Sequence, residues 1–186
     1  MTIRRSLALA LLLLLSSGCA SMHYSKTKVG TLKGKLLVQW IDHDKFIFIP
    51  DERNPLTFTR ADQSIITPGK MYTDGGSIPR PLWALRSYSP WGYAPAFIVH
   101  DWLFFTKYCK KPGYEKYTVH EAALVLSEVM KTMMEKEVAN KLALYSIYEA
   151  VDSPIAANLW ETGKCLEPGP TEAAPIPKLE YTIEFK

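Results

Sequence analysis

This chain has few cysteines, no large excess of charge of either sign, and no apolar run long enough to cross a membrane. Its three cysteines, Cys19, Cys109 and Cys165, leave a single pair once Cys19 is set aside. The 22 lysine and arginine residues nearly balance 19 aspartate and glutamate residues, so we expect no nucleic-acid partner. The aromatic content of 12% favours one folded domain with a real core over a disordered chain.

The first residues have the pattern of a secretory signal. Arg4 and Arg5 precede an apolar run at residues 6–15, and small residues then lead to Cys19. The apolar run is shorter than a spanning helix needs. We therefore predict a signal peptide at residues 1–18.

The junction Ser-Gly-Cys resembles a bacterial lipobox, although Ser16 stands where an aliphatic residue is usual. The resemblance implies that Cys19 is lipidated, for example with palmitate, and that the chain is attached to a membrane through this lipid anchor. Residue 20 is alanine rather than aspartate, which by the same resemblance implies an outer-membrane lipoprotein of the cell envelope that faces the periplasm. The alternative is an ordinary secreted protein cleaved near Ala20.

The two remaining cysteines are candidates for a disulfide. Without residues 1–18, the chain keeps 168 residues with 20 basic and 19 acidic side chains. In an exported protein, Cys109 and Cys165 are then a pair that can be oxidised. A disulfide that closes the loop from Cys109 to Cys165 would stabilise the protein by about 4 kcal/mol on the chain-entropy estimate. Two separate reduced thiols are the alternative.

The first half of the chain has the pattern of strands. A polar segment comes first, and we predict a lipidated cysteine and a flexible tether over residues 19–34. Residues 35–165 then form one domain. Its short β-rich runs, separated by turn residues, predict a small antiparallel sheet. The runs are residues 36–41, 46–49, 56–59, 64–67 and 71–73.

The second half changes to a helical period. We predict a helix from Pro95 to about Lys107, and a second one that Thr118 caps with Glu121 at the capping-box position. Two further helices are predicted at residues 137–152 and 156–162. Strands followed by three or four helices predict the α+β class. Residues 166–186 form a proline-rich tail, in which residues 181–185 either add an edge strand or stay mobile.

Two ionisable side chains, His100 and Asp101, interrupt the otherwise apolar helix that begins at Pro95. Residues three and four positions away from each of them are apolar, so neither has a polar neighbour on its own helix. Because adjacent residues point about 100° apart on a helix, we expect the two side chains not to face each other. Each must then find a partner on another segment, because a buried unpaired polar group is costly.

Two other segments carry suitable partners. Asp74 and Ser77 lie in the segment Asp-Gly-Gly-Ser-Ile-Pro, whose adjacent glycines let the backbone approach closely. Glu121 opens the second helix, which should run antiparallel to the first. We therefore expect Asp74, Ser77 or Glu121 near His100 and Asp101.

These motifs resemble those of a phage and bacterial family of uncharacterised proteins, domain of unknown function 1353. The resemblance rests on Asp74-Gly-Gly-Ser-Ile-Pro-Arg, Trp83, Ala94-Pro-Ala and His100-Asp101-Trp-Leu-Phe, and it spans roughly residues 35 to 160. The family usually opens its second helix with Ala-Asp, where this chain has His120-Glu121. The resemblance implies a fold and a residue cluster, and it implies no reaction.

Three classes of function fit these residues. In the enzyme hypothesis, His100 is a general base or a metal ligand, with Asp74, Asp101 or Glu121 orienting it or sharing a divalent cation, and the substrate is an envelope lipid or peptidoglycan. A variant makes Ser77 the nucleophile. In the structural hypothesis, the cluster only holds the fold together. In the interaction hypothesis, a non-catalytic lipoprotein binds an envelope or phage component through Trp83, Tyr88, Trp91 and Tyr93.

Overall fold

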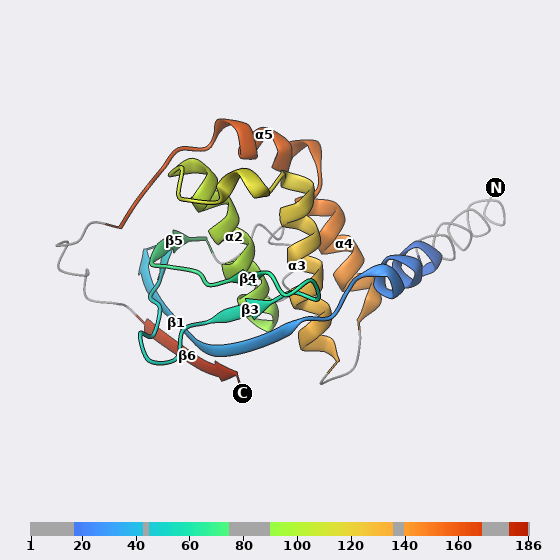
Figure 1. Cartoon of the computed structure of the whole chain (residues 1–186), viewed down its shortest axis with the longest axis horizontal. Coiled ribbons are helices and arrows are strands. Elements are labelled where there is room, and N and C mark those ends of the chain that lie inside the picture. Colours follow the sequence, from blue (N-terminus) through green and yellow to red (C-terminus); the bar gives the residue numbers. More distant parts are fainter. Residues whose placement is uncertain (1–16, 43–44, 75–89, 136–139, 169–178, 186) are drawn as a thin grey trace, which may run out of the picture.

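The computed structural model describes residues 17–42, 45–74, 90–135, 140–168 and 179–185. A curved antiparallel sheet forms one side of the molecule, and helices cover its inner face (Figure 1). The prediction of an α+β fold, with a sheet first and helices after it, is confirmed. In the described ranges, no helix is long and apolar enough to span a bilayer.

Strand β1 (Thr31–Asp42) organises the sheet. Along its length it pairs antiparallel with three strands, and the strand order is β4-β3-β1-β2-β5 with β6 also on β1. Leu32, Leu36 and Val38 alternate with more exposed residues, as expected for a strand with one face on the core. The other strands are β2 (Lys45–Phe48), β3 (Thr57–Thr59), β4 (Ile65–Ile66), β5 (Met71–Thr73) and β6 (Leu179–Phe185).

Strand β6 decides between the two alternatives for the end of the chain. It pairs with β1 from Gly34↔Phe185 to Trp40↔Leu179, so the tail contributes an edge strand. Gly34 has a φ of +101°, and a Cβ atom there would lie 2.1 Å from the carbonyl oxygen of Pro55. Only glycine fits this position of β1.

In the described residues, four longer helices lie between β5 and β6 in the sequence. They are α2 (Ala94–Tyr108), α3 (Val119–Met134), α4 (Lys141–Val151) and α5 (Pro154–Thr162), with short 3₁₀ helices η2 (Pro90–Tyr93) and η3 (Tyr114–Lys116). The predicted capping box is present: the Thr118 hydroxyl accepts from the Glu121 N–H, and the Glu121 carboxylate accepts from the Thr118 N–H at 2.7 Å. Helix α2 packs against α3 and β5.

A partly buried ion pair joins the sheet to α3. Arg60, directly after β3, donates from Nε and Nη2 to the two carboxylate oxygens of Glu128, at 2.7 and 2.9 Å. The hydrogen bonds to Glu128 raise the pKa of Arg60. A bidentate pair of this kind fixes both the distance of α3 from the sheet and its orientation relative to the sheet.

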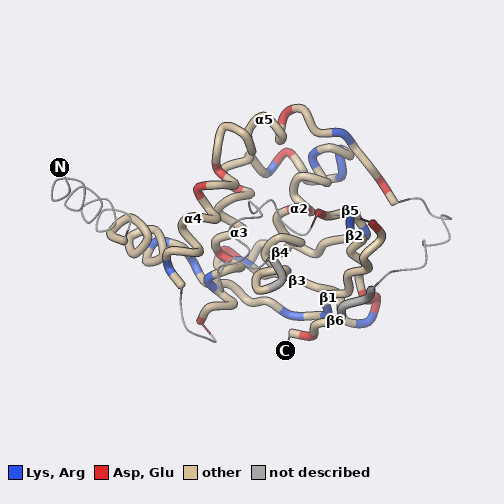
Figure 2. The backbone as a smooth tube through the Cα atoms, turned by 180° about the vertical axis from the view of Figure 1, so that it is seen from behind, with Lys and Arg blue, Asp and Glu red and all other residues tan. Residues whose placement is uncertain are grey.

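The segment before β1 differs from the predicted tether. Residues 17–26 are helical, and residues 31–34 already belong to β1. Lys131 of α3 donates to the carbonyl oxygens of Tyr24 at 2.9 Å and Thr27 at 3.0 Å. This lysine satisfies carbonyl groups at the end of the helix, which the polar composition of the segment did not reveal. Basic residues gather where the helix meets α4 (Figure 2).

The N-terminal helix is packed on the domain through His23. The His23 ring lies against Tyr148 of α4, with ring centroids 4.1 Å apart, and its Nε2 atom is 3.3 Å from the hydroxyl oxygen of Ser127. Ala20 is buried on the same helix, whereas Cys19 is exposed. The helix is therefore held at a fixed place on α3 and α4.

We predict that acid weakens the packing of this helix. Desolvation lowers the pKa of His23 below its usual 6.5, and the nearby carboxylates of Glu149 and Asp152 oppose this shift. A lowered pKa in the folded state gives stability that is present above the unfolded-state value and is lost as the pH falls through the folded-state value. Hydrogen exchange in residues 17–26, corrected for the intrinsic rate, should therefore speed up below pH 6.5.

His23→Phe is the matched control for this prediction. It keeps a ring against Tyr148 and removes the titrating group. The exchange protection of residues 17–26 should then be independent of pH. Equal pH dependence in both proteins would contradict the assignment to His23.

Candidate functional site

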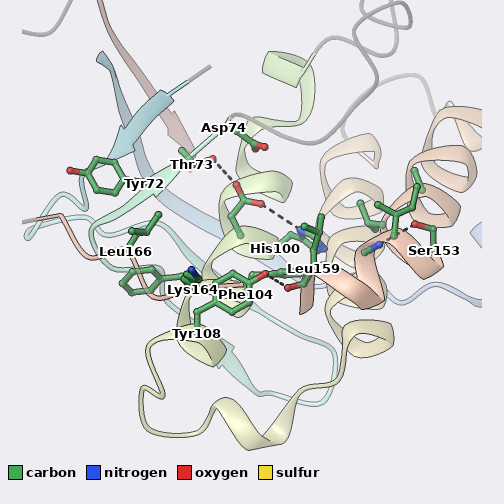
Figure 3. A pocket seen from close by; sticks show the side chains of 16 residues that line it. Tyr72, Thr73, Asp74, His100, Phe104, Tyr108, Ser153, Leu159, Lys164 and Leu166 are labelled. Carbon is green, nitrogen blue, oxygen red and sulfur yellow. Dashed lines mark hydrogen bonds and ion pairs between the residues drawn. The ribbon is translucent and has the colours of Figure 1, made fainter. Parts of the chain in front are cut away.

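Helix α2 carries His100 and Asp101 into the interior. Its residues from Ala94 to His100 are all buried, because the helix is covered by the sheet on one side and by α3 on another. His100 is buried, and the Asp101 side chain keeps 23% of its surface exposed. The end of β5 lies beside this part of α2, which places Thr73 and Asp74 next to the pair (Figure 3).

The His100 and Asp101 side chains face each other, so the prediction that they do not is wrong. Nδ1 of His100 lies 3.5 Å from Oδ1 of Asp101. Rotation about the side-chain bonds closes the separation that the helix sets between neighbouring Cβ atoms. The second oxygen of Asp101, Oδ2, accepts a hydrogen bond from the Thr73 hydroxyl at 2.6 Å. Asp101 therefore connects β5 to the imidazole.

Thr73 is a site residue that the sequence analysis missed. The only signal was its place beside Asp74 at the end of a predicted strand. Its side chain is buried and donates to a carboxylate, and such charge-assisted bonds are among the stronger ones.

The Nε2 atom of His100 has no hydrogen-bond partner in the part of the chain that the structure describes, although it is buried. The Phe104 ring lies on one side of the imidazole, with centroids 4.9 Å apart, and offers no conventional acceptor. Leaving such an atom unpaired costs about 1 to 3 kcal/mol. A polar atom kept at this cost next to an oriented acid is a candidate for function.

The other predicted site residues lie in different places. Asp74 is exposed and lines the same cavity as His100. Glu121 is not near it: its carboxylate caps its own helix, so the expected contact with His100 is absent. Ser77 lies outside the described residues. Of the aromatic residues considered for an interface, Tyr93 packs against the core.

A cavity of about 560 Å³ opens above the His100–Asp101 pair. It lies between the end of β5, the C-terminal turns of α2, and α5 with the segment after it (Figure 3). Apolar side chains form most of the wall. They are Phe104, Phe105, Val151, Ile155, Ala156, Leu159 and Leu166.

The last turn of α2 holds the α5 side of this cavity in place. Lys107 donates to the carbonyl oxygen of Trp160, and the Tyr108 hydroxyl donates to that of Leu159 at 2.7 Å. Cys109 forms a disulfide with Cys165, whose Cα atom is 4.7 Å from its own. Three consecutive residues thus fasten the end of α5 and the segment after it.

The environment of Tyr108 changes the pKa of its hydroxyl group. Burial, and then the negative charge of Asp101, raise the pKa of Tyr108 to about 12. Gly163 packs against the same ring, because a Cβ atom at this position would lie 1.9 Å from Cζ of Tyr108. Tyr108 therefore remains a neutral donor to α5 under ordinary conditions.

The described residues do not gather a metal site around His100. Within them, the group of three metal-type ligands whose donor atoms lie within 4.8 Å of one another is Cys109, Cys165 and Glu167. The two sulfur atoms of this group are bonded to each other and cannot act as thiolates. Asp74, His100 and Asp101 form no such group.

A family model described as "Protein of unknown function (DUF1353)" matches residues 53–149. The chain belongs to this family. The matched part of the chain contains Thr73, Asp74, His100 and Asp101, and it ends before α5. Neither the curated proteins nor the solved structures contain a match to the chain. Membership in the family therefore identifies the region that holds the polar pair, and its description supplies no reaction.

We predict that the disulfide stabilises the α5 wall. Replacing Cys109 and Cys165 together by serine should lower the free energy of unfolding by about 4 kcal/mol, because the open chain gains loop entropy. Urea unfolding would measure the change. A reductant should lower the midpoint for the wild-type protein and leave that of the double variant unchanged. An equal effect of reductant on both proteins would contradict the prediction.

Proposed function

We propose that this protein is a lipid-anchored component of the cell envelope that hydrolyses an ester or amide bond with His100 as general base. One observation carries the proposal. The Nε2 atom of His100 is unpaired among the described residues, while Nδ1 of the same ring lies next to Asp101 at the wall of a cavity. An imidazole with one nitrogen directed at an acid and the other kept free has the arrangement of a general base.

The contacts assign a task to each group. Thr73 holds Asp101, and Asp101 orients the Nδ1–H group and stabilises the imidazolium that forms. Nε2 then takes a proton from water as the water oxygen attacks the carbonyl carbon of the substrate. The proton passes from Nε2 to the leaving alcohol or amine as its bond to carbon breaks. Nδ1 and Oδ1 are 3.5 Å apart, and catalytic contacts of this kind shorten when a substrate binds.

The proposed anchor is Cys19. It is exposed at the start of the described part of the N-terminal helix, where an attached lipid would leave the fold undisturbed. Because this helix packs on α3 and α4, an acyl group on Cys19 would hold the domain directly at the bilayer. This geometry is compatible with an outer-membrane lipoprotein that faces the periplasm.

A second candidate function is non-catalytic binding, with the His100–Asp101 pair acting only in the structure. The observation in its favour is that the Nε2 atom of His100 is closed to solvent, so a substrate reaches it only after a neighbouring side chain moves. The apolar cavity would then hold an envelope component without altering it.

We predict that His100→Asn lowers hydrolysis by about 10²- to 10⁴-fold, the range expected for loss of a general base. The asparagine amide can still donate to Asp101, so the pair survives without its base. Rates should be measured on p-nitrophenyl acyl esters, phospholipid vesicles and peptidoglycan fragments. His120→Asn is the matched control, because His120 pairs with Asp152 at 2.8 Å outside the cavity. Unchanged rates with a lower melting temperature in His100→Asn would favour the structural role.

We also predict that Cys19 takes up lipid in a Gram-negative host. Growth with an alkyne-tagged palmitate should label the wild-type protein and place it in the membrane fraction. Cys19→Ser should abolish the label, whereas Cys109→Ser should keep it. An unlabelled wild-type protein released in soluble form would indicate an ordinary secreted protein.

A further inference from the structure

The mouth of the cavity exposes aliphatic side chains to water. Ile155, Leu159 and Leu166 line it and are 75%, 48% and 69% exposed. They come from two turns of α5 and from the segment that the disulfide attaches to α2. These exposed aliphatic groups are continuous with the buried Phe105 and Val151 inside the cavity. Such a continuous apolar surface at one opening indicates an apolar ligand that covers it.

A cation at this opening has no ion-pair partner among the described residues. Lys164 lines the cavity between Gly163 and Cys165 and forms no ion pair with any described residue. Two other lysines of this region, Lys107 and Lys111, are paired with Glu161 and Glu167. The site therefore offers an apolar wall, a positive charge at its edge that no described residue pairs, and His100 in its interior.

From this combination we infer that the cavity binds an acyl chain of an anionic phospholipid. The acyl chain covers Ile155, Leu159 and Leu166, and the lipid phosphate pairs with Lys164. A glycan fits this wall poorly, because its hydroxyl groups would lose their water partners against aliphatic carbon. The inference deepens the proposed function by choosing lipid over peptidoglycan as its substrate class, and it rests on that function only for the hydrolysis.

Photolabelling in vesicles tests the binding. The full-length protein, inserted in phosphatidylethanolamine vesicles, is exposed to phosphatidylglycerol with a diazirine in its acyl chain, and the labelled peptides are identified by mass spectrometry. Label should fall on α2, α5 and the segment 163–166. Label spread evenly over the surface would overturn the inference, and so would protection of the cavity by peptidoglycan fragments.

Two aspartate variants provide a matched pair. Ile155 and Leu142 both stand at the second position of a helix and are both exposed, but only Ile155 lines the cavity. Aspartate is well tolerated in the first turn of a helix, so both variants should fold. Ile155→Asp should lower cavity labelling by roughly tenfold, since it removes apolar contact and adds a charge. Leu142→Asp should leave it unchanged, and an equal loss in both variants would overturn the inference.

Two further variants separate the lipid source and the chemistry. Lys164→Glu should lower labelling by phosphatidylglycerol by about two- to fivefold, as for an exposed ion pair, and spare labelling by the zwitterionic phosphatidylcholine analogue. A cavity labelled by a diazirine fatty acid but not by phosphatidylglycerol would overturn the choice of phospholipid. His100→Asn should keep the labelling. If it does, and the wild-type protein shows no hydrolysis, the proposed function fails while the lipid site stands.

Discussion

The burial of α2 is the constraint on which the site depends. The helix is apolar on nearly every side, so it is stable only where the sheet and α3 cover it together. Its burial carries His100 and Asp101 inward, and the loss of their contacts with water costs free energy. The fold recovers part of this cost through Thr73, which donates to Asp101. It leaves the Nε2 atom of His100 unsatisfied among the described residues, and such local exceptions to good packing are where function is found.

The cavity combines parts of two origins. Its polar side, from Thr73 to Asp101, lies within the residues that match the family. The part of its apolar wall that α5 and residues 163–166 form follows the matched part, and it is fastened to α2 by Lys107, Tyr108 and the disulfide. The polar pair and most of the apolar wall therefore belong to different segments of the chain. A substitution in α5 changes the wall without moving the pair.

Most of the fold could be predicted from the sequence, because its strands and helices have clear periods and caps. The capping box at Thr118 and the strands of the sheet are examples. The N-terminal helix could not, because Lys131, more than 100 residues away, satisfies its carbonyl groups. At the site, the sequence identified His100 and Asp101 as costly residues in an apolar helix. It misjudged their mutual orientation, which depends on side-chain rotation, and it misplaced Glu121, whose carboxylate is used in the cap.

The disulfide makes the completeness of the cavity depend on the redox conditions around the protein. Helix α5 has nine residues, too few to be stable without its attachments. In a reducing environment, the thiols of Cys109 and Cys165 would be separate, and the wall would be held only by non-covalent contacts. Oxidation would then be the step that completes the cavity. For the envelope protein that we propose, the compartment in which the chain is made would hold only the form with an incomplete cavity.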